Sequence, residues 1–120
     1  MLQGAGNLDG TGNTLANSLF GNSGDNTLDG GAAADVLTGD AGNDTFTFHV
    51  GQGDGDTVVD FAGNGAAAGD SLHFIGYGAG ATFTQNDATH WQVNFNGGLS
   101  HEVITFLNGV TIDPTDVVFM

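Results

Sequence analysis

The chain has 120 residues, contains no lysine and no arginine, and carries a formal net charge of −14. Nucleic acids and anionic membrane surfaces are bound largely through Lys and Arg, so this composition excludes both as partners. The 14 acidic side chains repel one another, and a folded form therefore needs counter-charge from outside the chain. For carboxylates and other oxygen ligands, that counter-charge is best supplied by a hard cation such as calcium.

The length suits a single domain, 1–120, and the chain contains no cysteine for disulfide or thiol chemistry. Residues 1–7 lack the basic and apolar pattern of a cleavable secretory signal. No apolar run is long enough for a transmembrane segment.

Residues 12–59 repeat with a period of nine, interrupted by a three-residue insertion before the last unit. Each unit has glycine first, Asn or Asp sixth and a large apolar residue eighth. The first positions are Gly12, Gly21, Gly30, Gly39 and Gly51; the sixth are Asn17, Asn26, Asp35, Asp44 and Asp56; the eighth are Leu19, Leu28, Leu37, Phe46 and Val58.

The first six residues of a unit are turn formers, and the last three form a very short strand with one apolar side chain facing inward. Because such a strand cannot bury its side chain alone, successive units are expected to stack as a solenoid. Two units make one coil, so loops two units apart lie on the same edge. This predicts that Asp35 lies between Asn17 and Asp56, and that Asn26 lies beside Asp44.

Loops of this kind offer glycine carbonyls and one side-chain oxygen, and two stacked loops can supply the roughly six to eight oxygen ligands of calcium. The predicted ligand set is Asn26, Asp35, Asp44 and Asp56 with Gly21, Gly30, Gly39, Gly42, Gly51 and Gly53. Asn17, Asp60 and Asp70 are further candidates, for which a role in turns or in a cap is the alternative.

The third and fourth units, residues 30–47, resemble the glycine- and aspartate-rich nonapeptide of calcium-binding RTX proteins. Asn17, Asn26 and Ala33 depart from that pattern. The residues and the resemblance together predict an all-β fold, with a short parallel β-roll (β-helix) of calcium-binding nonapeptides over 12–59. The first unit, which keeps little of the motif, is expected to act as a degenerate cap.

The second half, residues 60–120, contains strand-like runs at 72–75, 81–85, 90–95 and 101–107, separated by turn signals. We expect these runs to form an antiparallel β cap over the end of the roll. Residues 53–61 and 69–72 resemble the segment that follows the repeats in serralysin-type C-terminal domains. Residues 115–120 resemble the uncleaved C-terminal export signal of type I secreted proteins.

Residues suited to other functions are few. His49, His73, His90 and His101 lack zinc-ligand spacing, and no catalytic constellation is found, so we expect no enzymatic activity. Trp91, with Tyr77 and His90 nearby in sequence, offers a possible sugar-stacking group, although packing in the sheet is the more common role of such a Trp.

These features predict a calcium-binding module, with Ca²⁺ as cofactor, of a type I secreted bacterial protein. The resemblance implies that the chain passes the type I secretion exporter unfolded, folds on calcium in the extracellular space, and serves as a secretion and stability domain behind an upstream domain. The alternative is a polysaccharide-binding module like those of alginate epimerases, or a cell-surface module as in adhesins.

Overall fold

The computed structural model describes residues 9–52, 54–62, 69–78, 80–108, 112 and 114–119. Apart from two short 3₁₀ turns, η1 (Asn96–Gly98) and η2 (Pro114–Asp116), the regular structure of these residues is all strand. The strands are β1 (Asp9–Thr11), β2 (Ser18–Phe20), β3 (Thr27–Asp29), β4 (Val36–Thr38), β5 (Thr45–His49), β6 (Thr57–Val58), β7 (Ser71–Ile75), β8 (Thr82–Gln85), β9 (His90–Phe95), β10 (Ser100–Phe106) and β11 (Val117–Phe119). Within the described ranges, no helix is long and apolar enough to span a membrane.

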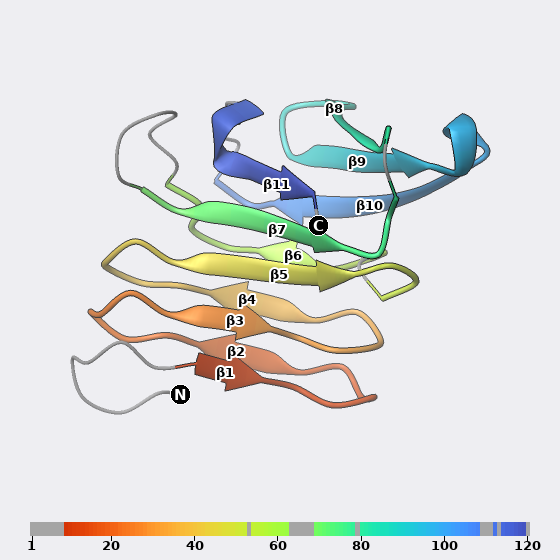
Figure 1. Ribbon diagram of the computed structural model, residues 1–120. Coiled ribbons are helices and arrows are strands. Elements are labelled where there is room, and N and C mark those ends of the chain that lie inside the picture. Colours follow the sequence, from red (N-terminus) through yellow and green to blue (C-terminus); the bar gives the residue numbers. More distant parts are fainter. Residues whose placement is uncertain are drawn as a thin grey trace.

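Successive nonapeptides place their strands alternately in two sheets (Figure 1). One sheet has the order β1-β3-β5-β7-β11 and the other β2-β4-β6-β10-β9-β8. The neighbouring repeat strands are parallel and two units apart, with Thr27 opposite Thr45 and Ser18 opposite Val36. The predicted parallel roll is confirmed, and Figure 1 shows its coils rising from the N-terminal end to the last strands.

The eighth residue of each repeat points into the space between the two sheets. Leu28, Leu37, Phe46 and Val58 are fully buried there, whereas Leu19 in the first coil is half-buried. The predicted apolar column is therefore present, and it is covered least at the N-terminal end. Burying one large apolar side chain contributes about 1.5–3 kcal/mol, which compensates for the brevity of each strand.

The expected boundary between roll and cap is wrong for residues 72–75. Strand β7 pairs in parallel with β5, so the roll continues beyond residue 59. The physical reason is that β5 is longer than the other repeat strands and presents both Phe46 and Phe48 to the core. Leu72 and Phe74 of β7 lie opposite these two residues and bury them.

The antiparallel part of the cap is confined to β8, β9 and β10. Strand β10 also pairs in parallel with β6, and the C-terminal strand β11 pairs in parallel with β7, so both sheets of the roll continue directly into the last third of the chain. The predicted turns at 86–89 and 96–98 connect β8 to β9 and β9 to β10.

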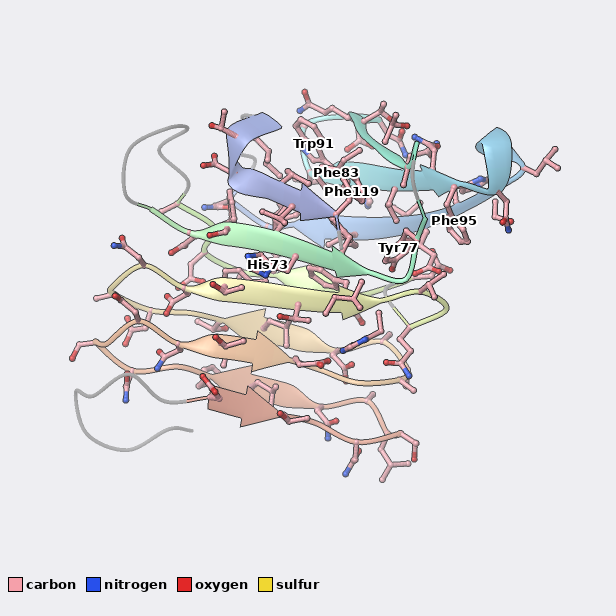
Figure 2. The ribbon with its side chains drawn as sticks, viewed as in Figure 1. His73, Tyr77, Phe83, Trp91, Phe95 and Phe119 are labelled. Carbon is pink, nitrogen blue, oxygen red and sulfur yellow. The ribbon has the colours of Figure 1, made fainter. Side chains whose placement is uncertain are left out.

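Aromatic side chains fill the C-terminal end of the roll (Figure 2). The ring of Phe74 lies 5.0 Å from that of Phe83 and 5.3 Å from that of Phe119, measured between centroids. Phe83 in turn stacks on Trp91 at 5.1 Å with an interplanar angle of 18°. This aromatic packing joins the antiparallel strands to the roll and gives the repeats a firm end to stack on.

Candidate calcium sites

The sixth residues of the repeats form two ladders, each running along the loops that precede one sheet. In the first ladder, the Asn17 N–H donates to Asp35 Oδ1 at 2.7 Å, and the Asp35 N–H donates to Asp56 Oδ1 at 2.9 Å. In the second ladder, the Asn26 N–H donates to Asp44 Oδ1 at 2.8 Å. The predicted neighbours are therefore together on both ladders.

Asp70 extends the second ladder by one rung. The Asp44 N–H donates to Asp70 Oδ1 at 2.8 Å, and Asp70 precedes β7 as Asp44 precedes β5. The arrangement in which the ladder residue immediately precedes its strand therefore continues beyond the recognisable nonapeptides.

Asp35 and Asp44 each have one buried carboxylate oxygen that accepts no hydrogen bond. Their side chains are 1% and 0% exposed, and in both the Oδ2 atom is buried without a hydrogen-bond partner. A buried carboxylate oxygen left unpaired is costly, and native structures resolve the cost with a donor, a proton or a cation. A hard cation fits this donor chemistry.

The first glycine of a repeat is required by the sixth residue of the same repeat. A Cβ added to Gly39 would lie 2.3 Å from Asp44 Oδ2, and one added to Gly30 would lie 2.4 Å from Asp35 Oδ2. Gly21 has the same relation to Asn26, whose Oδ1 would be 2.4 Å away. Glycine is therefore needed at the first position because the side chain of the sixth residue approaches its Cα closely. Any side chain there would displace the candidate ligand oxygen.

The remaining predicted glycines differ in role. Gly42 needs its φ of 98°, and its added Cβ would meet the Gly24 carbonyl oxygen at 2.4 Å. Gly51 also has a positive φ, 84°, but has open space around its Cα. Gly53 lies outside the described residues.

Burial shifts the protonation of the ladder residues. Desolvation, opposed by a hydrogen bond from the Asn26 N–H, raises the pKa of Asp44 to about 7. Desolvation likewise raises the pKa of Asp56 to about 7, and it raises the pKa values of Asp35 and Asp70 in the same direction. Repulsion from neighbouring carboxylates adds to each shift. The ladders therefore disfavour negative charge in the absence of a cation.

Asp60 and Asp70 obtain backbone donors for both carboxylate oxygens. Asp60 accepts hydrogen bonds from the N–H groups of Gly39 at 2.8 Å and Asp40 at 2.7 Å. Asp70 Oδ2 accepts one from the Ala62 N–H at 2.9 Å. These bonds supply the turn and cap role considered for both residues, and calcium ligation by them stays a prediction.

Two buried acids were not identified from the sequence. Glu102 is 5% exposed, and its Oε1 accepts a hydrogen bond from the Tyr77 hydroxyl at 2.8 Å while its Oε2 accepts one from the Gly51 N–H at 2.8 Å. Asp116, also 5% exposed, precedes β11 as Asp70 precedes β7. The signal for Asp116 was the acid immediately before a short apolar strand; Glu102 carries no local signal.

Within the described ranges, no group of three or more His, Asp or Glu side chains is placed so that it could hold a metal ion by itself. His49 pairs with Asp29 at 2.8 Å, and His90 pairs with Asp87 at 2.8 Å. A cation held by the repeat loops would therefore take its other ligands from backbone carbonyls, as calcium often does.

Trp91 is largely buried and lines an apolar pocket of about 320 Å³ together with Phe83 and Phe119. Its side chain is 7% exposed and packs on Phe83 between the sheets, and Tyr77 is 5% exposed (Figure 2). The sugar-stacking interpretation of these residues is not supported by their burial, and packing in the sheet is what the structure shows.

Comparison with known families identifies the repeats. Residues 11–46 match the model of the RTX calcium-binding nonapeptide repeat in four copies. These residues are RTX repeats, and calcium is the cation of this family, as predicted. The family is defined by calcium binding and not by a catalytic activity. No curated protein matches the chain.

Comparison with solved structures supports the architecture. The fold is similar to the solution structure of the AlgE6R3 subunit of the mannuronan C5-epimerase from Azotobacter vinelandii, with a TM-score of 0.55 and 24% sequence identity. The match covers 98% of this chain and 81% of that chain. At this level of identity the likeness shows the fold alone.

Proposed function

We propose that the chain is a calcium-dependent folding module whose ions are held at the loops of Asp35 and Asp44. The observation that carries the proposal is the pair of buried Oδ2 atoms without hydrogen-bond partners. Each lies against the first glycine of its own repeat. A calcium ion there would take further oxygen ligands from the backbone, as calcium commonly does. Asp56, on the adjacent rung of the first ladder, is a further proposed ligand, whereas the side chain of Asn26 is hydrogen-bonded within its own loop.

The mechanism follows from the cost of closing these loops. The Oδ1 atoms of Asp35 and Asp44 already bridge to the preceding coil, because they accept hydrogen bonds from the N–H groups of Asn17 and Asn26. Their Oδ2 atoms oppose closure because they lose water and gain nothing. Bound calcium supplies the missing positive charge, so the loops close and the strands beside them pair. Without calcium, repulsion within the ladders favours the open chain.

Circular dichroism with calcium and with EDTA tests this proposal. We expect the β-sheet signal to be lost in EDTA and to return when calcium is added. Asp44→Ala should weaken calcium binding measured by calorimetry, whereas Asp87→Ala, which changes an exposed acid outside the roll, should not. A β-sheet spectrum that is identical in excess EDTA and in calcium would rule out calcium-dependent folding.

We further propose that the module accompanies an upstream domain through a type I exporter and folds in the extracellular space. Low cytosolic calcium would keep the chain open during passage, since extracellular calcium modules typically bind with Kd of about 10⁻⁴–10⁻³ M. The similarity of residues 115–120 to a C-terminal export signal supports this role. Fusing the chain behind a reporter in cells with a type I exporter tests it, and a reporter retained inside the cells would contradict it.

Polysaccharide binding is the second candidate, because the similar solved module belongs to a mannuronan C5-epimerase. The charge of −14 and the absence of Lys and Arg oppose direct binding of a uronate polymer. A polysaccharide ligand of this chain is therefore expected to be neutral. Titration with neutral and uronate oligosaccharides, followed by NMR, distinguishes them, and the absence of binding to either would reject this candidate.

A further inference from the structure

Four repeat loops, 12–17, 21–26, 30–35 and 39–44, lie wholly within the described residues, and they close in two different ways. In the first two loops, the sixth residue is Asn, and its side-chain oxygen accepts a hydrogen bond from the second residue of the same loop. The Asn13 N–H donates to Asn17 Oδ1 at 2.9 Å, and the Asn22 N–H donates to Asn26 Oδ1 at 2.8 Å. Asn26 Nδ2 also donates to Asn22 Oδ1 at 3.0 Å. These loops are closed entirely by the chain's own donors.

In the next two loops, the sixth residue is Asp, and the corresponding internal bond is missing. The Gly31 N–H instead donates to Asp29 Oδ1 at 3.0 Å, and the Asp40 N–H donates to Asp60 Oδ2 at 2.7 Å. The Oδ2 atoms of Asp35 and Asp44 are left buried without a partner. A carboxylate can only accept hydrogen bonds, whereas an amide also donates, so an Asp at this place cannot make the Asn26-to-Asn22 contact.

We propose that the sixth residue of each repeat selects between two kinds of loop closure, metal-free for Asn and calcium-requiring for Asp. The loops 12–17 and 21–26 then form a calcium-independent first coil, and the calcium requirement lies in the loops 30–35 and 39–44. This inference rests on the proposed function, because it assigns the calcium of that function to particular coils.

The difference in charge supports this division. Asn17 and Asn26 add no charge to the ladders, so the first coil closes without repulsion against Asp35 and Asp44 above it. The first repeat also has the least apolar cover, with Leu19 half-buried and Leu15 67% exposed. A repeat with so little buried surface gains from hydrogen bonds that are present at every calcium concentration.

Reciprocal substitutions test the proposal in the full chain. The number of ions taken up on folding is the slope of the logarithm of the folding constant against that of the calcium concentration. Asn26→Asp should raise this slope by about one, because it replaces a donor with a second buried acceptor facing Asn22. Asp44→Asn should lower the slope by about one, because it puts a donor where Oδ2 is unpartnered. Asn17→Asp and Asp35→Asn repeat the test in the first ladder.

Controls with the same change of charge lie in the exposed turn between β8 and β9, where Asn86→Asp and Asp87→Asn should leave the slope unchanged. If Asn26→Asp and Asp44→Asn have the slope of the unmodified chain, or fail to fold in saturating calcium, the proposed selection rule is wrong. A different result would contradict the proposed function: the folding constant of the unmodified chain would not depend on the calcium concentration, so its slope would be zero.

Discussion

Replacing Gly39 with alanine tests the contact between the first and sixth residues of a repeat. The added Cβ would lie 2.3 Å from Asp44 Oδ2, 2.8 Å from its Cγ and 3.1 Å from its Cβ. Rotating the carboxylate about its last bond cannot relieve a clash that involves all three atoms. Asp44 Oδ1 is also held by the Asn26 N–H at 2.8 Å, so the whole side chain is fixed in place.

The size of the effect follows from these distances. An ordinary contact needs at least about 3.4 Å, so Asp44 Oδ2 has to retreat by about 1 Å. Calcium–oxygen distances span only about 2.3–2.6 Å, so a retreat of that size removes this oxygen from the ion. We expect Gly39→Ala to weaken calcium binding by at least about tenfold, which is about 1.4 kcal/mol. Overpacking should also lower the stability of the fold in saturating calcium by about 1–3 kcal/mol.

Calorimetric calcium titration and denaturant unfolding in saturating calcium measure these effects. Gly78→Ala is the matched control, because Gly78 has a φ of 90° but open space where the Cβ would lie. Its backbone strain should reduce the stability in saturating calcium and leave the number of bound ions unchanged. The reasoning is refuted if Gly39→Ala binds calcium with the affinity and stoichiometry of the unmodified chain.

Three further predictions concern other parts of the molecule. Because burial raises the pKa values of Asp44 and Asp56 to about 7, the calcium-free fold takes up protons. In EDTA, the β-sheet signal should therefore increase as the pH falls from about 8 to about 5, and the stabilisation by calcium should shrink; a signal that does not change with pH would contradict these shifts. Ala33 has a φ of 70°, so Ala33→Gly should stabilise the fold by about 0.5–1 kcal/mol in thermal or urea unfolding, and a loss of stability would show that this strain is absent. Tyr77→Phe removes the donor to the buried Glu102 and should cost about 1–3 kcal/mol in urea unfolding with calcium stoichiometry unchanged, whereas a lost ion would place Tyr77 within a calcium site.

The period of the repeats was enough to predict the roll, because an isolated nonapeptide strand has no way to bury its apolar residue. The extent of the roll was not predictable in the same way. Leu72 and Phe74 alternate with polar residues as they would in a parallel or an antiparallel strand, so their pattern does not identify the neighbouring strand. The choice is decided by β5, whose second inward residue, Phe48, needs Phe74 beside it.

The ladders were predictable for a similar reason: stacking two units apart places Asn26 beside Asp44 without any further information. The partners of individual oxygens were not predictable. Asp60 is paired because the Gly39 and Asp40 N–H groups point toward it, which depends on how the peptide planes turn in that loop. Glu102 binds the Gly51 N–H across 51 residues of sequence, a contact that no local pattern encodes.

Net charge alone does not set the calcium requirement of this chain. Asp60, Asp70 and Glu102 are acidic and at least partly buried, yet each accepts donors from the chain at both oxygens. Exposed acids keep their water and cost little. Only where a buried oxygen lacks a donor, as in Asp35 and Asp44, does closing a loop leave a charge uncompensated. A sequence with the same −14 charge, but with these two acids moved to exposed turns, should therefore lose its specific calcium dependence while keeping its general response to salt. The position of carboxylates relative to N–H donors, more than their number, determines whether this roll needs metal.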